Sequence, residues 1–152
     1  MEVDNVIIDV DQFNIEEAAK IHSISWKESH RAFCNVDFIN KHTSKHQKEY
    51  IQKKINNGYQ FYMLIADIPV GIISISSESV IEDLYVLPNK QNKGFGSQLL
   101  RFAISKCTAC PRLWILENNT DARRLYERVG FHPTGKVNRG IGKLDEIELA
   151  LT

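Results

Sequence analysis

The feature that most constrains the fold is a glycine-rich junction between a strand-like segment and a helix-like segment. Residues 91–97 read Gln-Asn-Lys-Gly-Phe-Gly-Ser. Residues 80–87, just before it, are rich in the β-branched and aromatic side chains that favour strands. After it, Leu99, Leu100 and Ala103 recur at helical spacing. Glycine lets the backbone approach a ligand closely, and the first amides of a helix point outward without partners. The junction therefore predicts an anion site, suited to a phosphate group.

The spacing of the two glycines separates three kinds of phosphate loop. A P-loop needs four residues between its glycines, followed by Lys, whereas Gly94 and Gly96 are one residue apart and Lys93 precedes them. A dinucleotide fingerprint needs a third glycine where this chain has Leu99. The remaining pattern, Gln-x-x-Gly-x-Gly starting at Gln91, resembles the pyrophosphate loop of the GCN5-related N-acetyltransferases (GNATs), which bind acetyl-coenzyme A (acetyl-CoA).

A second segment, residues 118–131, supports the same resemblance. Asn119 or Thr120 is a suitable helix N-cap, and Gly130 is a suitable stop. Ala122, Leu125, Tyr126 and Val129 form one apolar stripe, so Tyr126 taken alone fits a core aromatic. The pattern Asn-x-x-Ala-x-x-Leu-Tyr also resembles the GNAT segment after the fifth strand. The resemblance implies that Tyr126 reaches the coenzyme sulfur and that Asn119, with Ala122 in the same segment, lies along the pantetheine arm.

The order of expected elements agrees with this family along nearly the whole chain. Strands are expected at 6–10, 60–66, 70–76, 80–87, 113–116 and 145–151, and helices at 14–28, from 44 to about 56, after the glycine loop and from about 120. The resemblance implies a mixed α/β (α+β) GNAT fold. Its central twisted sheet is mostly antiparallel, with about six to seven strands flanked by about four helices. We expect residues 1–152 to form a single domain.

The amino-acid composition limits the classes of partner that this chain is expected to bind. Hydrophobic content of 43% and charged content of 25% are ordinary for a soluble globular protein. Nineteen basic and nineteen acidic residues balance, which argues against nucleic acid as the main partner. No apolar run approaches the ~20 residues that span a bilayer. Residues 1–4 are acidic and lack the start of a signal peptide, so we expect a cytoplasmic protein without a membrane partner. A homodimer is left open.

The sequence does not predict a metal site. Cys107 and Cys110 have a metal-like spacing, but no second pair accompanies them, and Cys34 stands alone. Small buried thiols are the simpler interpretation. His42 and His46 are four residues apart, but Thr43 stands where a zinc protease motif needs Glu.

The resemblance implies transfer of an acetyl group from acetyl-CoA to a primary amine of a small molecule or peptide, by direct attack in a ternary complex. It places the backbone of Leu84, Tyr85 and Val86 along the pantetheine arm. The expected pyrophosphate residues are Gln91, Asn92, Lys93, Gly94, Phe95, Gly96 and Ser97. The alternative is a non-catalytic acyl-CoA-binding or sensor module that keeps the fold.

The reaction needs a proton acceptor and a proton donor. An amine of ordinary pKa, about 10.4, is mostly protonated near neutral pH, so a base must deprotonate it, directly or through water. Tyr126 is the expected donor to the leaving thiolate. Glu82 is preferred as the base, with Asp83 and Glu117 as alternatives. Consecutive strand residues face opposite sides, so only one of Glu82 and Asp83 points inward unless a bulge intervenes.

The acceptor remains undetermined by the sequence. In the family that this chain resembles, specificity comes from the first two helices and the segment between them, here about residues 20–58. The aromatic and imidazole side chains that could line a pocket there are His22, Trp26, His30, Phe33, Phe38 and Tyr59.

Overall fold

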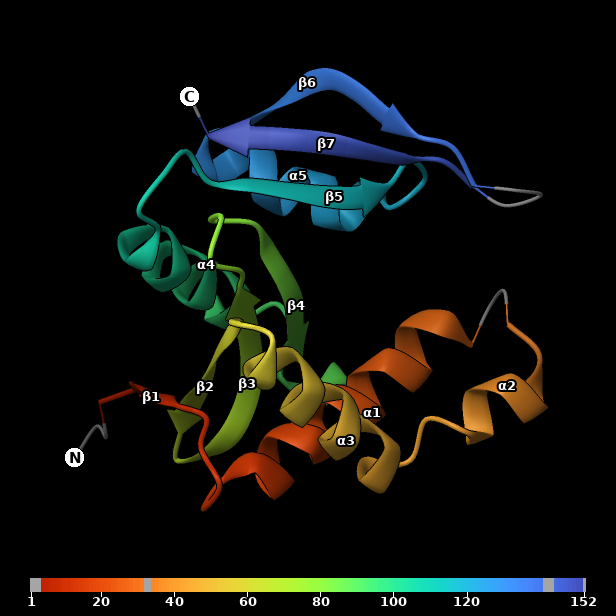
Figure 1. Ribbon diagram of the computed structural model, residues 1–152, viewed down its shortest axis with the longest axis vertical. Coiled ribbons are helices and arrows are strands. Elements are labelled where there is room, and N and C mark those ends of the chain that lie inside the picture. The colour runs from red at the N-terminus through yellow and green to blue at the C-terminus, as the bar shows by residue number, and fades with distance from the viewer. Residues whose placement is uncertain (1–3, 32–33, 141–143, 152) are drawn as a thin grey trace.

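The computed structural model describes residues 4–31, 34–140 and 144–151 and places them in two antiparallel sheets (Figure 1). The first sheet has the strand order β1-β2-β3-β4 and the second β5-β7-β6. The strands are β1 (Val6–Asp9), β2 (Gln60–Ala66), β3 (Ile68–Ile75), β4 (Ile81–Val86), β5 (Arg112–Leu116), β6 (Phe131–Asn138) and β7 (Glu146–Leu151). The helices are α1 (Ile15–His30), α2 (Val36–Asn40), α3 (Ser44–Asn56), α4 (Phe95–Lys106) and α5 (Thr120–Val129), with a 3₁₀ turn at Pro88–Lys90.

This architecture confirms the predicted mixed α/β class, and it adds two elements that the sequence pattern did not reveal. Helix α2 has five residues, which is too few to show a periodicity. Strand β6 contains Pro133 and Gly135, residues that are depleted in strand interiors. Both residues are tolerated because β6 lies at a sheet edge. The register of β6 against β7 also shifts between Pro133 and Val137. No helix in the described part of the chain is long and apolar enough to cross a membrane.

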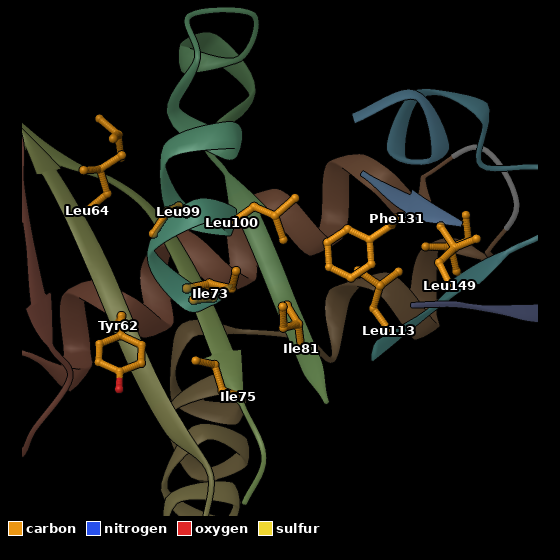
Figure 2. Close-up of a cluster of buried hydrophobic side chains, with 13 residues drawn as sticks. Tyr62, Leu64, Ile73, Ile75, Ile81, Leu99, Leu100, Leu113, Phe131 and Leu149 are labelled. Atoms are coloured by element: carbon orange, nitrogen blue, oxygen red, sulfur yellow. The ribbon is translucent and has the colours of Figure 1, made fainter. Parts of the chain in front are cut away.

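Helices cover both faces of the first sheet, because successive β2 side chains point to opposite sides. Tyr62 and Leu64 belong to a core cluster with Leu99 and Leu100 of α4 (Figure 2). Phe61, also on β2, belongs to a second cluster with residues of α1 and α3. Figure 1 shows the same arrangement, with α4 on one side of the sheet and α1 and α3 on the other. The first sheet is therefore the central layer of the molecule.

The two sheets meet at β4 and β5, which touch at one end and diverge at the other. An isolated parallel bridge joins Val80 to Arg112, just before β4 and at the start of β5. Beyond it, β4 pairs only with β3 and β5 only with β7. Ile81 of β4 and Leu113 of β5 belong to the same buried apolar cluster, with Phe131 and Leu149 beside Leu113 (Figure 2). The open end leaves space between the strands for a ligand.

Candidate active site

One continuous cleft occupies the space between β4 and β5. It consists of two adjoining cavities of about 820 and about 290 Å³. The larger is lined by β4, the end of β5 and the last turns of α1, and the smaller by the loop before α4 and the face of α5. Both are lined by Leu84, Val86, Gln91, Asp121, Ala122 and Tyr126. The cleft thus brings together the two segments that carry the sequence resemblance.

The smaller cavity ends at the first turn of α4. Gly94 is the N-cap of this helix, and its φ of 85° lies in the left-handed region that favours glycine. No side chain caps the helix, and the first helical bond runs from the Gln98 amide to the Gly94 carbonyl over 3.1 Å. The amides of Phe95, Gly96 and Ser97 are therefore available to an anion, with the positive end of the helix dipole behind them.

The charged residues beside this turn differ in part from those expected. Lys90 and Arg128 line the smaller cavity together with Gln91 and Asn92, whereas Lys93 is exposed and lines neither cavity. The Gln91 amide nitrogen donates to the Val86 carbonyl over 3.2 Å, which ties the loop to the end of β4. The sequence pattern did not predict Arg128 at this place, because Arg128 lies on α5, more than thirty residues beyond the glycine loop.

A β-bulge on β4 decides where the candidate carboxylates point. Ser74 pairs with Glu82 and Ile72 pairs with Tyr85, so one residue of β3 faces two residues of β4. Asp83 takes up the extra length with a φ of 47°. Strict alternation would send Glu82 and Asp83 to opposite faces, but the bulge lets both reach the same ammonium group, that of Lys54. Sequence reasoning allowed for a bulge but could not place it.

Asp83 accepts four hydrogen bonds at the base of the cleft. Oδ1 accepts from Tyr50 (2.9 Å) and lies 3.3 Å from His22 Nε2. Oδ2 accepts from Lys54 (2.7 Å) and from Ser74 (2.7 Å). Burial alone would raise the pKa of Asp83, but the His22 hydrogen bond and the Lys54 charge hold that pKa well below its usual range. An ionised carboxylate has about four acceptor positions, and here all are occupied.

Lys54 links this buried network to Glu82. Burial would lower the pKa of the ammonium group, but the charge of Asp83 outweighs burial and raises the pKa above its ordinary value. Lys54 also pairs with Glu82, whose side chain is 36% exposed, compared with 7% for Asp83. Tyr50 stays a hydrogen-bond donor because burial and the Asp83 charge raise the pKa of its hydroxyl. Glu82 is therefore the more accessible of the two carboxylates on β4.

Behind Asp83, hydrogen bonds continue away from the cleft. His22 Nδ1 lies 2.6 Å from Gln47 Nε2, and Gln47 Oε1 lies 2.7 Å from His46 Nδ1. Both hydrogen bonds of the His22 ring form when its proton is on Nε2. Nε2–H then donates a hydrogen bond to Asp83, and Nδ1 accepts one from the Gln47 amide. Gln47 is 2% exposed and His22 3% exposed, so both are interior polar groups fixed by partners. They hold the Asp83 carboxylate in place from behind.

Tyr126 lies where the two cavities meet. Its helix, α5, begins at Asn119, whose side chain accepts the Ala122 amide over 3.2 Å, and ends at Gly130 in the left-handed region. The Tyr126 ring packs edge-on against Phe131, with centroids 6.0 Å apart. Burial raises the pKa of Tyr126 to about 12, so the hydroxyl keeps its proton near neutral pH. Tyr126 therefore combines a core contact with a place in the cleft.

Some of the remaining predicted site residues line the cleft and others lie outside it. Asn119 and Tyr85 line the larger cavity, but Glu117 is exposed and lines neither. His30 lines the larger cavity, and Tyr59 lies under the Lys54 ammonium, 4.5 Å from ring centroid to Nζ.

Three of the candidates for the acceptor pocket, Trp26, His30 and Phe38, form a cluster beside the cleft. Trp26 stacks between His30 and His42, with centroid separations of 4.0 and 3.5 Å, and Phe38 packs against both Trp26 and His42. This cluster joins α1 to α2 and to the segment between α2 and α3. Phe33, another candidate, lies outside the described residues.

Comparison with known proteins identifies the family. The acetyltransferase (GNAT) domain matches residues 27–142, more than half of the chain. The protein therefore belongs to the GNAT acetyltransferase family, which confirms the resemblance carried by the glycine loop and the Tyr126 segment. The probable N-acetyltransferase Rv2775 of Mycobacterium tuberculosis is 29% identical over 133 residues, which cover 79% of this chain and 75% of that protein.

Solved structures share the fold at lower identity. The PaiA N-acetyltransferase of Thermoplasma acidophilum, in complex with coenzyme A, superposes with a TM-score of 0.69 at 21% identity, over 96% of this chain and 98% of that one. YncA of Salmonella typhimurium, solved with its cofactor acetyl-CoA, gives a TM-score of 0.71 at 18% identity, over 97% and 93% of the two chains.

Proposed function

We propose that the protein is an N-acetyltransferase that transfers the acetyl group of acetyl-CoA to a primary amine of a small molecule or peptide, by direct attack in a ternary complex. The observation that carries the proposal is the single cleft that joins an anion-binding helix start to a cluster containing Tyr126 and Glu82. GNAT family membership supports the acetyl-transfer chemistry. Acetyl-CoA supplies the reactive thioester, and the residues of this chain bind it, orient it and move protons.

The donor would lie along the whole length of the cleft. The free amides at the start of α4, between Lys90 and Arg128, suit the pyrophosphate. The exposed edge of β4 at Leu84, Tyr85 and Val86 offers backbone groups to the pantetheine arm, because β5 does not pair with β4 there. This arrangement would bring the thioester to Tyr126, where the two cavities meet.

The proton-transfer roles follow from accessibility. Tyr126 remains protonated near neutral pH and would donate to the leaving thiolate. Asp83 makes a poor base because four donors already occupy its oxygens. Of the four groups that donate to Asp83, only Lys54 also contacts Glu82, and Glu82 is the more exposed carboxylate. We therefore assign Glu82 the role of base, directly or through a water molecule. Asp83 and Lys54 would then position Glu82.

Two measurements test the proposal together. Calorimetric titration with acetyl-CoA reports donor binding, and release of free thiol across a broad panel of amines reports transfer. We expect both. Absence of heat and of a melting shift with acetyl-CoA would refute the proposal at its base. The ion pair of Glu82 with Lys54 also fits a non-catalytic acyl-CoA-binding module. Coenzyme binding without thiol release for any amine would favour that second function.

A further inference from the structure

The charge of the cleft changes sign along its length. Five carboxylates and one lysine line the larger cavity, and they are Glu28, Glu82, Asp83, Asp121, Glu146 and Lys54. His30 adds no compensating charge near neutral pH, because burial holds its pKa below the ordinary value. The smaller cavity instead has Lys90, Arg128 and the helix amides against Asp121. The chain as a whole has zero net charge, so the acidity belongs to this cavity and not to the protein surface in general.

The carboxylates differ in how far the protein neutralises them. Lys54 serves both Asp83 and Glu82. Glu28 pairs with Arg31 on the surface, with 51% of the Glu28 side chain exposed. Glu146, at the start of β7, is half-buried and has no ion pair within the residues that the structure describes. Glu146 lines the larger cavity and is therefore placed to attract a cation carried by a ligand.

A buried hydroxyl in the same cavity also lacks a partner. Ser25 of α1 is 4% exposed and lines the larger cavity together with Glu28. Its Oγ is the buried side-chain polar atom for which the described part of the structure provides no hydrogen-bond partner. Leaving such a group unsatisfied is unfavourable, and native proteins seldom tolerate it without a reason. A donor on a ligand, such as an ammonium group, would satisfy it.

We propose that the acceptor is a small aliphatic amine that carries two or more positive charges. This inference rests on the proposed N-acetyltransferase function and assigns its acceptor class. One amine is acetylated near Glu82 and Tyr126, while a second ammonium is held by Glu146 and Glu28, with Ser25 Oγ accepting a hydrogen bond from the acceptor. A cavity of about 820 Å³ that also admits the pantetheine arm suits a small molecule. A concave site of one charge sign also concentrates cations.

The test compares acceptors that differ by one charge. Diaminobutane and butylamine have the same carbon chain, and a short lysine-containing peptide represents the macromolecular alternative. We expect kcat/KM for thiol release to be roughly tenfold higher for diaminobutane. Glu146→Gln and Ser25→Ala should raise KM for the diamine several-fold more than they raise KM for butylamine. Glu16→Gln, an equal change of charge on an exposed residue paired with Lys48, is the control and should leave both amines unchanged.

Binding separates failure of this inference from failure of the proposed function. Titration of each amine into protein saturated with coenzyme A measures the preference without turnover. Equal affinity for the two amines, a preference for the peptide, or no effect of Glu146→Gln and Ser25→Ala would overturn the acceptor assignment and leave acetyl transfer standing. Diamine-selective binding without thiol release would sustain the cation site and refute the transferase function.

Discussion

Replacing Lys54 with methionine tests whether a buried ion pair fixes the carboxylates of the cleft. The side chains of Lys54 and Asp83 are 17% and 7% exposed, and Nζ lies 2.7 Å from Oδ2. Removing one partner of a buried pair costs about 3–5 kcal/mol, because the other charge stays buried without compensation. His22, Tyr50 and Ser74 still donate to Asp83 in the variant. We therefore expect a loss of about 3 kcal/mol, the lower end of that range.

Urea unfolding measures this loss. With a slope of about 1–3 kcal/mol per molar urea, the midpoint should fall by about 1–3 M. Lys48→Met is the matched control on the same helix. Lys48 pairs with Glu16, but the two side chains are 46% and 77% exposed, so its loss should stay below about 1 kcal/mol. Equal losses for the two variants would refute the reasoning, because burial would then not determine the contribution of the pair.

The pH dependence has a definite sign. The folded-state pKa of Asp83 lies below its ordinary value, so its pairing stabilises the protein above about pH 4 and is lost as the pH falls through the folded-state pKa. In Lys54→Met the pKa of Asp83 should rise, so the deficit should be largest near neutral pH and shrink as Asp83 becomes protonated. Adding Asp83→Asn should restore part of the stability. A deficit that does not shrink as the pH falls below about 4 would contradict this account.

Three further predictions concern the donor site and the core. Tyr126→Phe should keep the acetyl-CoA affinity and lower kcat about a hundredfold, and an unchanged kcat would remove Tyr126 from proton transfer. In the parent protein, a loss of activity near pH 10 that disappears in this variant would contradict a Tyr126 pKa of about 12. Gly94→Val should weaken acetyl-CoA binding about tenfold or more, whereas Gly58→Val, which meets a similar positive φ (95°) away from the cleft, should destabilise the fold without changing Kd. Leu100→Ala should cost about 2–5 kcal/mol in thermal or urea unfolding because Leu100 is fully buried, and Phe13→Ala, at an 84% exposed position, should cost less than about 0.5 kcal/mol.

Local patterns predicted the elements that flank the glycine loop. The positive φ of Gly94, the uncapped start of α4, and the α5 helix between Asn119 and Gly130 all follow from residues within a few positions of one another. Strand β6 was missed for a local reason as well, since Pro133 and Gly135 obscure its pattern. Its pairing with β7 is a tertiary interaction that overrides this weak preference.

The contacts around Asp83 in the larger cavity could not be predicted in the same way. Asp83 meets Lys54, Tyr50 and His22, which lie 29, 33 and 61 residues away along the chain, and no short pattern records such meetings. The placement of Asp83 also depends on a bulge, which shifts every later side chain of β4 by one position and has no glycine to mark it.

The sequence by itself determined the family, the order of the main elements and the loop that suits a pyrophosphate, because glycine geometry and helix periodicity are local properties. Only the tertiary structure decided that Glu82 and Asp83 share Lys54, that Arg128 and not Lys93 lines the smaller cavity, and that Ser25 and Glu146 line the larger, acidic one. Those facts depend on how α1, α3, α5 and β7 pack around the gap between β4 and β5. That packing brings distant side chains together and removes water from between them, which gives their charges an effect that they do not have in the extended chain.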